Sequence, residues 1–194
     1  PPAVNAAVKP GQILGELTVV TGIGFTVTVA TAVPVHPPLL AVTVYDVVVA
    51  IGDPVQRKNV VESLPKGTSF ASIIHPTAII STWVEIGEGS IVTAGSILTC
   101  NIKIGKFVTL NLMCTVGHDT VIGDYSSFML SVNISGEVQI EESVYVGTGA
   151  KIINQLTIGK STIVGAGAVV SKSLPEKCTA VGIPAKPIKF HTNE

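Results

Sequence analysis

Residues 98–140 read LTCNIK-IGKFVT-LNLMCT-VGHDTV-IGDYSS-FMLSVN-ISGEVQ-I when divided every six residues, and each block begins with an aliphatic or aromatic side chain. The same period runs unbroken from Ile74 to Val170. A helix would rotate every sixth residue away from one face, and a simple strand would alternate every two residues. Short strands bent at corners return every sixth residue to the interior. The pattern therefore predicts a mainly β fold built on a parallel β-helix.

Three blocks make one coil of eighteen residues, so their first residues form three columns on a triangular prism. Column one holds Ile74, Val92, Leu110, Phe128, Val146 and Val164, column two holds Ile80, Leu98, Val116, Ile134, Ile152 and Val170, and column three holds Ile86, Ile104, Ile122, Ile140 and Ile158. Four residues further on, the side chains are mostly small or β-branched, as at Ser90, Cys114 and Ala150. We expect these side chains to fill the inner corners, because larger ones would overpack the core.

The three corners, numbered here by the column that they follow, differ in charge. Charged residues stand at the third corner, which is predicted to face water: Glu88, Lys106, Asp124, Glu142 and Lys160. The first and second corners are nearly uncharged. Because uncharged corners of a prism need a cover, the pattern predicts threefold packing of identical chains into a homotrimer.

The composition narrows the class of protein. With 194 residues, a formal charge of -1 and no basic block, the chain is not expected to bind nucleic acid or an anionic membrane surface. Cys100, Cys114 and Cys178 are odd in number and lack metal-ligand spacing, so we expect reduced thiols in a cytoplasmic protein, with Cys114 in the core. A catalytic cysteine is the alternative, although nothing near these residues in the sequence would activate a thiol.

The uncharged run from Leu17 to Tyr45 raises the possibility of a membrane segment. Prolines interrupt it, and its threonines favour strands over a transmembrane helix. We also find no cationic start followed by a cleavage-type site, so neither a membrane segment nor a signal peptide is expected.

A second unit precedes the prism. Residues 45–53 have the pattern of a buried strand ending in a glycine turn, and residues 54–64 that of a helix beginning at Pro54. A strand followed by a helix predicts a parallel α/β sheet, which binds ligands at the carboxyl ends of its strands. Gly52 and Asp53 would lie at that edge, as binding residues or as a structural turn. We therefore expect a small α/β domain over residues 1–70, a linking strand at 70–74, and the β-helix with a C-terminal tail over 71–194.

His118 and Asp119 are the one adjacent histidine and carboxylate on the predicted coils. An imidazole titrates near neutrality and suits a general base, and a bonded carboxylate would raise its basicity and fix its tautomer. Gly136 follows one coil later on the same corner and would leave room above the ring. The alternative is a surface or interface histidine.

Two glycine pairs, Gly147-Thr148-Gly149 and Gly165-Ala166-Gly167, are eighteen residues apart and should stack on the first corner. Glycine allows a ligand to approach the backbone closely, so a slender chain could lie along this groove. The alternative is that corners of such coils favour glycine in general, as at Gly87 and Gly105.

The hexads resemble those of the hexapeptide-repeat acyltransferases, whose prism is a left-handed β-helix. More narrowly, the chain is similar to the sugar acetyltransferases of the bacillosamine and sialic acid pathways. The motifs that carry this resemblance, from residue 45 onward, are Tyr45-Asp46, Ala50-Ile51-Gly52-Asp53, Arg57-Lys58, Ile74-His75-Pro76-Thr77-Ala78, Gly117-His118-Asp119, Ile122-Gly123-Asp124 and Val181-Gly182-Ile183-Pro184-Ala185-Lys186.

The resemblance implies an acetyl-CoA-dependent N-acetyltransferase of a nucleotide-linked amino sugar, with no metal. It implies a homotrimer with acetyl-CoA between adjacent prisms, His118 as general base assisted by Asp119, and backbone groups near Gly136 facing the acyl carbonyl or sugar. The pantetheine path would be lined by Thr148 and Ala166, beside Gly147 and Gly165. A Rossmann-like N-terminal domain would hold the nucleotide, which gives Gly52 a binding role.

The sequence departs from the family's pattern at two places. Ser127 stands where relatives often carry a second histidine, so one contact to the cofactor or acceptor is altered. Residues 1–44 lack the glycine-rich turn that cradles phosphates.

Three other functions stay open. An O-acetyltransferase of sialic acid or a related sugar would use the same base and groove. A metal hydrase would need about three histidines at an interface, and only His75 and His118 lie on the coils. A non-catalytic β-helix scaffold would need a regular ladder of threonines or charges, which the columns lack.

Overall fold

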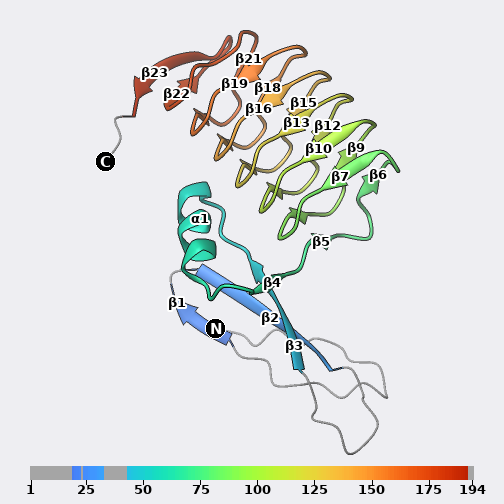
Figure 1. The fold of residues 1–194 in the computed structure, drawn as a ribbon. Coiled ribbons are helices and arrows are strands. Elements are labelled where there is room, and N and C mark those ends of the chain that lie inside the picture. The colour runs from blue at the N-terminus through green and yellow to red at the C-terminus, as the bar shows by residue number, and fades with distance from the viewer. Residues whose placement is uncertain (1–18, 23, 33–42, 192–194) are drawn as a thin grey trace, which may run out of the picture.

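The computed structural model describes residues 19–22, 24–32 and 43–191, which form a prism of β-coils with a small sheet and helix α1 beside it (Figure 1). The column-one sheet contains β5 (Ile73–Ile74), β8 (Ile91–Val92), β11 (Thr109–Leu110), β14 (Ser127–Phe128), β17 (Tyr145–Val146), β20 (Ile163–Val164), β22 (Cys178–Val181) and β23 (Lys186–Phe190). The column-two sheet contains β6 (Ile79–Ile80), β9 (Ile97–Leu98), β12 (Thr115–Val116), β15 (Asn133–Ile134), β18 (Lys151–Ile152) and β21 (Val169–Val170). The column-three sheet contains β7 (Val84–Ile86), β10 (Ile102–Ile104), β13 (Val121–Ile122), β16 (Gln139–Ile140) and β19 (Thr157–Ile158).

The parallel β-helix predicted from the hexads is confirmed. Strands of successive coils pair in parallel with a shift of eighteen residues, as Leu110 does with Phe128 and Ile104 with Ile122. The left-handed sense of the prism, which came from the resemblance, stays a prediction. Beyond the last coil, β22 and β23 pair antiparallel and close that end of the column-one sheet (Figure 1).

The three columns form one continuous core. Their members are buried from Val92 onward, whereas Ile74 in the first coil is 48% exposed because it stands at the open end of the stack. The small residues at the inner corners are buried as expected, and the hydroxyl of Ser90 donates to the carbonyl of Gly105 at 2.9 Å. Burial also raises the pKa of the Cys114 thiol to about 11, so this cysteine is an unreactive core residue.

From Ile86 to Val164, each corner turns through a residue with positive φ, three positions past the column residue. Asn101, Asp119 and Glu137 adopt φ values of 53°, 58° and 60° at successive second corners. Asparagine, aspartate and glycine tolerate this left-handed conformation best, which explains part of the corner composition.

The N-terminal piece is a mixed sheet in the order β1 (Val19–Gly22), β2 (Gly24–Ala32), β3 (Thr43–Val49) and β4 (Ser69–Phe70). Strands are found where the threonines at 21, 26, 28 and 31 predicted them, whereas Thr18 lies outside the described residues. The strand expected over residues 45–53 is present as β3 but already ends at Val49. The expected parallel sheet is found only for β3 and β4, because β1–β2 and β2–β3 pair antiparallel. One residue separates β1 from β2, which is too short for a crossover connection. A Rossmann-like domain is therefore not seen in the described residues.

Helix α1 (Pro54–Ser63) begins where the sequence predicted. The Asp53 side chain caps it by accepting a hydrogen bond from the backbone N–H of Gln56 at 2.8 Å. The expected linking strand at 70–74 is divided into β4 and β5, because β4 pairs with β3 and β5 with β8. The described part of the chain contains no helix long and apolar enough to cross a membrane.

The third corner is not simply a water-facing edge, which corrects the prediction from its charges. Helix α1 packs against it, between the small sheet and the prism (Figure 1). The fully buried Arg57 guanidinium donates to the carbonyls of Phe107 at 2.8 Å and Tyr125 at 2.5 Å. Burial lowers the pKa of Arg57 to about 10, and Lys58 pairs with Glu142 at 2.6 Å.

Candidate active site

The predicted pair of His118 and Asp119 lies on the second corner, between β12 and β13. Nδ1 of the imidazole is 2.7 Å from Oδ2 of Asp119. A charged carboxylate can only accept, so Nδ1 carries the proton and Nε2 presents a lone pair. Both side chains are about half exposed in the single chain, and ligands can reach them. The geometry suits a general base with an orienting carboxylate.

Gly136 lies directly beneath the imidazole, as the sequence predicted. A Cβ atom at this position would stand 2.6 Å from Nε2 and 2.7 Å from Cε1 of His118. The ring can occupy its position only because residue 136 has no side chain. Gly136 is thus part of the arrangement that places Nε2 at the corner.

Asn101 completes the group and was missed from the sequence. Its side-chain amide donates to Oδ1 of Asp119. The bond from Asn101, followed by that from His118, holds the pKa of the Asp119 carboxyl below its usual value. Asp119 therefore stays ionised opposite Nδ1. The spacing of eighteen residues between Asn101 and Asp119 was the available signal.

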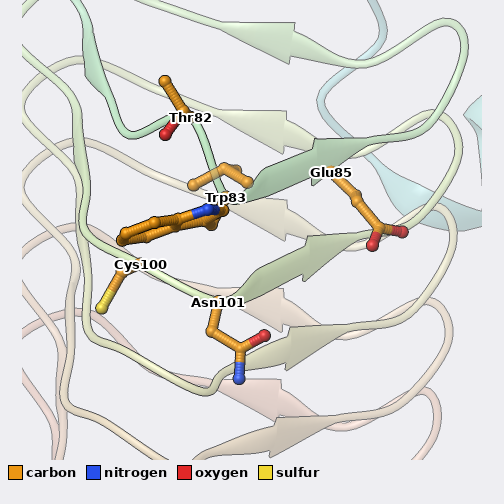
Figure 2. A pocket seen from close by; sticks show the side chains of 6 residues that line it. Thr82, Trp83, Glu85, Cys100 and Asn101 are labelled. Carbon is orange, nitrogen blue, oxygen red and sulfur yellow. The ribbon is translucent and has the colours of Figure 1, made fainter.

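Asn101 also lines a surface pocket on the same corner, together with Thr82, Trp83, Val84, Glu85 and Cys100. Figure 2 shows the Trp83 indole beside Cys100, with the Asn101 amide pointing away from the ring. Trp83 is 74% exposed, which is unusual for so large an apolar residue. The sequence did not predict this pocket.

The glycine pairs lie on the first corner and differ in what they permit. A Cβ at Gly147 would stand 2.5 Å from the Ala166 nitrogen, so this glycine allows the coils to stack closely. A Cβ at Gly149 would meet nothing within 4 Å, and Thr148 and Ala166 are exposed. A slender ligand therefore has access to this edge.

Within one chain, the glycine corner and the histidine corner do not meet. The first corner joins the column-one sheet to the column-two sheet, and the second corner follows at the other side of the column-two sheet. Thr148 and His118 are therefore on different edges of the same prism. A ligand that uses both kinds of edge at one site needs a second copy of the chain.

Ser127 occupies a different environment from the one its family position suggested. Its side chain is fully buried, and its hydroxyl accepts a hydrogen bond from Arg57 Nη2 at 2.8 Å. Contact with a cofactor would require α1 to leave this position.

Gly52 and Asp53 lie beside the column-one sheet and line a second pocket. Its remaining lining residues are Pro54, Val55, Met129, Ser143, Tyr145, Ser161 and Ile163. The turn before α1 therefore forms one wall of a cleft whose other wall is the prism. His75, by contrast, lies on the first corner, where its ring nitrogen contacts Thr77 Oγ1 at 2.9 Å. Among the described residues, no group of three histidine, cysteine or acidic side chains is arranged to hold a metal ion.

Comparison with known proteins places this chain in a family. No protein-family model matches the chain. GDP-perosamine N-acetyltransferase of Escherichia coli O157:H7 is 38% identical over 148 residues, covering 73% of this chain and 66% of the relative. The crystal structure of PerB from Caulobacter crescentus with CoA and GDP-perosamine superposes with a TM-score of 0.70 at 36% identity, covering 73% of this chain and 69% of that one. The chain belongs to the hexapeptide-repeat sugar N-acetyltransferase family.

Another member of this sugar N-acetyltransferase family has been solved with a bound acyl donor. The acetyltransferase domain of PglB from Neisseria gonorrhoeae FA1090, in complex with acetyl coenzyme A, superposes with a TM-score of 0.71 at 33% identity. The match covers 74% of this chain and 70% of that one. The chain spans about two thirds or less of the length of the curated relatives it matches. The family predicted from the hexads and motifs is confirmed.

Proposed function

We propose that this protein is an acetyl-CoA-dependent N-acetyltransferase that acts on a nucleotide-linked amino sugar. The observation that carries the proposal is the His118 imidazole, which is tied through Nδ1 to Asp119 and presents Nε2 over Gly136 at an accessible corner. The complexes of PerB with CoA and GDP-perosamine and of PglB with acetyl coenzyme A support the substrate classes.

In the proposed reaction, the sugar amine attacks the carbonyl carbon of the thioester, and Nε2 of His118 accepts a proton from the amine nitrogen. The N–C bond forms while the C–S bond breaks. The same proton then passes from the imidazolium to the departing sulfur, which leaves as the thiol of CoA. Asp119 stabilises the transient imidazolium, because it stays ionised under the influence of Asn101 and His118.

Acetyl-CoA lies along the first corner in this proposal, where Thr148 and Ala166 flank the open glycine edge. Because His118 stands on a different corner, the thioester reaches the base of an adjacent copy, and the working unit is a homotrimer. The exposed apolar side chains on the first corner, Leu112 and Met113, support burial against another copy.

The acceptor's nucleotide portion binds beside Gly52 and Asp53. Support for this assignment comes from the cleft that these residues form with Met129 and Tyr145. Gly52 has no side chain, and an added Cβ would meet nothing within 4 Å, so the cleft has room for a ligand at this position.

The test measures acetyl transfer from acetyl-CoA to GDP- and UDP-linked amino sugars, with the release of free thiol as the readout. We expect His118→Ala to lower kcat by about 10²–10⁴-fold and to leave the oligomeric state unchanged. His75→Ala is the matched control, since His75 is an exposed histidine on another corner. A His118→Ala enzyme with the wild-type rate would exclude this residue as the base.

An O-acetyltransferase would use the same base and groove. Parallel assays with acceptors that differ only in an amine or a hydroxyl at the reacting carbon separate the two reactions. Exclusive transfer to the hydroxyl acceptor would overturn N-acetylation and retain the site.

A further inference from the structure

Asn101 lies one coil before Asp119 on the second corner. Its amide donates to Oδ1 of Asp119, while Oδ2 of the same carboxylate contacts Nδ1 of His118 at 2.7 Å. Both carboxylate oxygens are therefore engaged, each by a different partner. We propose that Asn101 is a positioning residue for His118, because it fixes the Asp119 carboxylate in the orientation that keeps Nδ1 protonated and Nε2 free. This inference rests on the proposed role of His118 as general base.

The negative charges on the second corner explain why the Asp119 carboxylate needs a partner that fixes its orientation. Asp119 and Glu137 occupy the same turn position in adjacent coils, so two like charges stand one strand spacing apart. Each carboxylate accepts from an amide on its far side: Asp119 from Asn101, and Glu137 from Gln155 at 3.1 Å. Glu85, in the pocket that Asn101 lines, adds a further negative charge. Without its amide, Asp119 would be free to rotate away from Glu137 and from the imidazole.

A purely conformational role is the alternative for Asn101. Its φ of 53° lies in the left-handed region, where asparagine is well tolerated. Glycine adopts this conformation without strain. Asn101→Gly therefore removes the amide and keeps the turn, and it separates the two roles. Gln155→Gly is the matched control, because Gln155 has a φ of 61° on the same corner and donates to Glu137.

The first measurement determines the tautomer of His118 by ¹⁵N NMR of the imidazole nitrogens in the full chain. The His118 signals are assigned by comparison with His118→Gln. We expect wild type and Gln155→Gly to show a protonated Nδ1 and an unprotonated Nε2 at neutral pH. Asn101→Gly is expected to show a mixture of the two tautomers. An unchanged tautomer in Asn101→Gly would overturn the proposal.

The second measurement is steady-state acetyl transfer. We expect Asn101→Gly to lower kcat about tenfold, in the range seen for outer partners of functional histidines, with an unchanged KM for acetyl-CoA. Asn101→Asp, which also tolerates the turn, places a further carboxylate beside Asp119. It should lower kcat and move the acidic limb of the pH profile to higher pH, since added negative charge favours the imidazolium.

Equal losses of kcat in Asn101→Gly and Gln155→Gly would also overturn the positioning role, because they would indicate a general effect on the corner. If the wild-type protein transfers no acetyl group, the proposed function fails. The NMR comparison still decides whether Asn101 orients the imidazole, so the two failures are distinguishable.

Discussion

Gly136→Ala tests the geometry of the candidate base without removing any titratable group. The new Cβ would stand 2.6 Å from Nε2 of His118, whereas ordinary contacts begin at 3.4 Å. The ring must therefore move by about 0.8 Å, and a displacement near 1 Å at a reacting group costs on the order of 10²-fold in rate. Since Gly136 does not have a positive φ, alanine should be accepted by the backbone. We expect kcat to fall about 100-fold.

The assay is thiol release under saturating acetyl-CoA, with the melting temperature measured on the same samples. Asn154→Ala is the control, because Asn154 is exposed at the equivalent position one coil further along the corner. We expect both variants to keep the wild-type melting temperature within a few degrees. A fully active Gly136→Ala enzyme would show that Nε2 does not act from its position over residue 136. A large loss of melting temperature would instead show that the glycine serves the fold.

Three further outcomes follow from the described contacts. Arg57→Met leaves the buried Phe107 carbonyl and the partly buried Tyr125 carbonyl without their donor, so denaturant titration should show a loss of about 3 kcal/mol in the free energy of unfolding. Lys58→Met removes a part-exposed ion pair and should cost less than about 1 kcal/mol. Equal losses in the two variants would contradict this account. Glu142→Gln should lower the melting temperature at pH 7 but not in acid. Lys160 and then Lys58 hold the pKa of the Glu142 carboxyl below its usual value. The stability that the charged carboxylate contributes is therefore complete above the usual pKa and is lost as the pH falls through the lowered pKa. Thr148→Trp should raise the KM for acetyl-CoA about tenfold at an unchanged melting temperature, corresponding to roughly 1.4 kcal/mol, and an unchanged KM would move the cofactor away from the first corner.

The prism was predictable from the sequence because each coil places the same kinds of side chain at the same core positions. A period of six leaves a visible pattern in the columns, and the small inner residues at Ser90, Cys114 and Ala150 follow from the limited space. The imidazole over Gly136 was also predictable, since the spacing of eighteen residues defines which side chains stack. Applied one coil earlier, the same spacing would have identified Asn101.

The contact between α1 and the third corner was not predictable in the same way. Arg57 binds chiefly to backbone carbonyls, and every residue has one, so no side-chain pattern marks its partners. The charges of the third corner correctly predicted solvent exposure for Lys106 and Glu88, which are about half exposed. They did not indicate that helix α1 packs nearby. The antiparallel pairing of β1 and β2 depends on a one-residue connection rather than on hydrophobic period.

The shift of eighteen residues between paired strands also limits how the length of this protein can change. An insertion of one residue in a coil would turn the following core side chains outward, whereas duplication of a whole coil preserves every column. Such a duplication would lengthen the prism by one coil, or about 4.8 Å. Natural or engineered variants should therefore differ in steps of one coil. The contacts of helix α1 and the histidine site lie in the same coils, so an added coil leaves both intact only when it is inserted elsewhere in the prism.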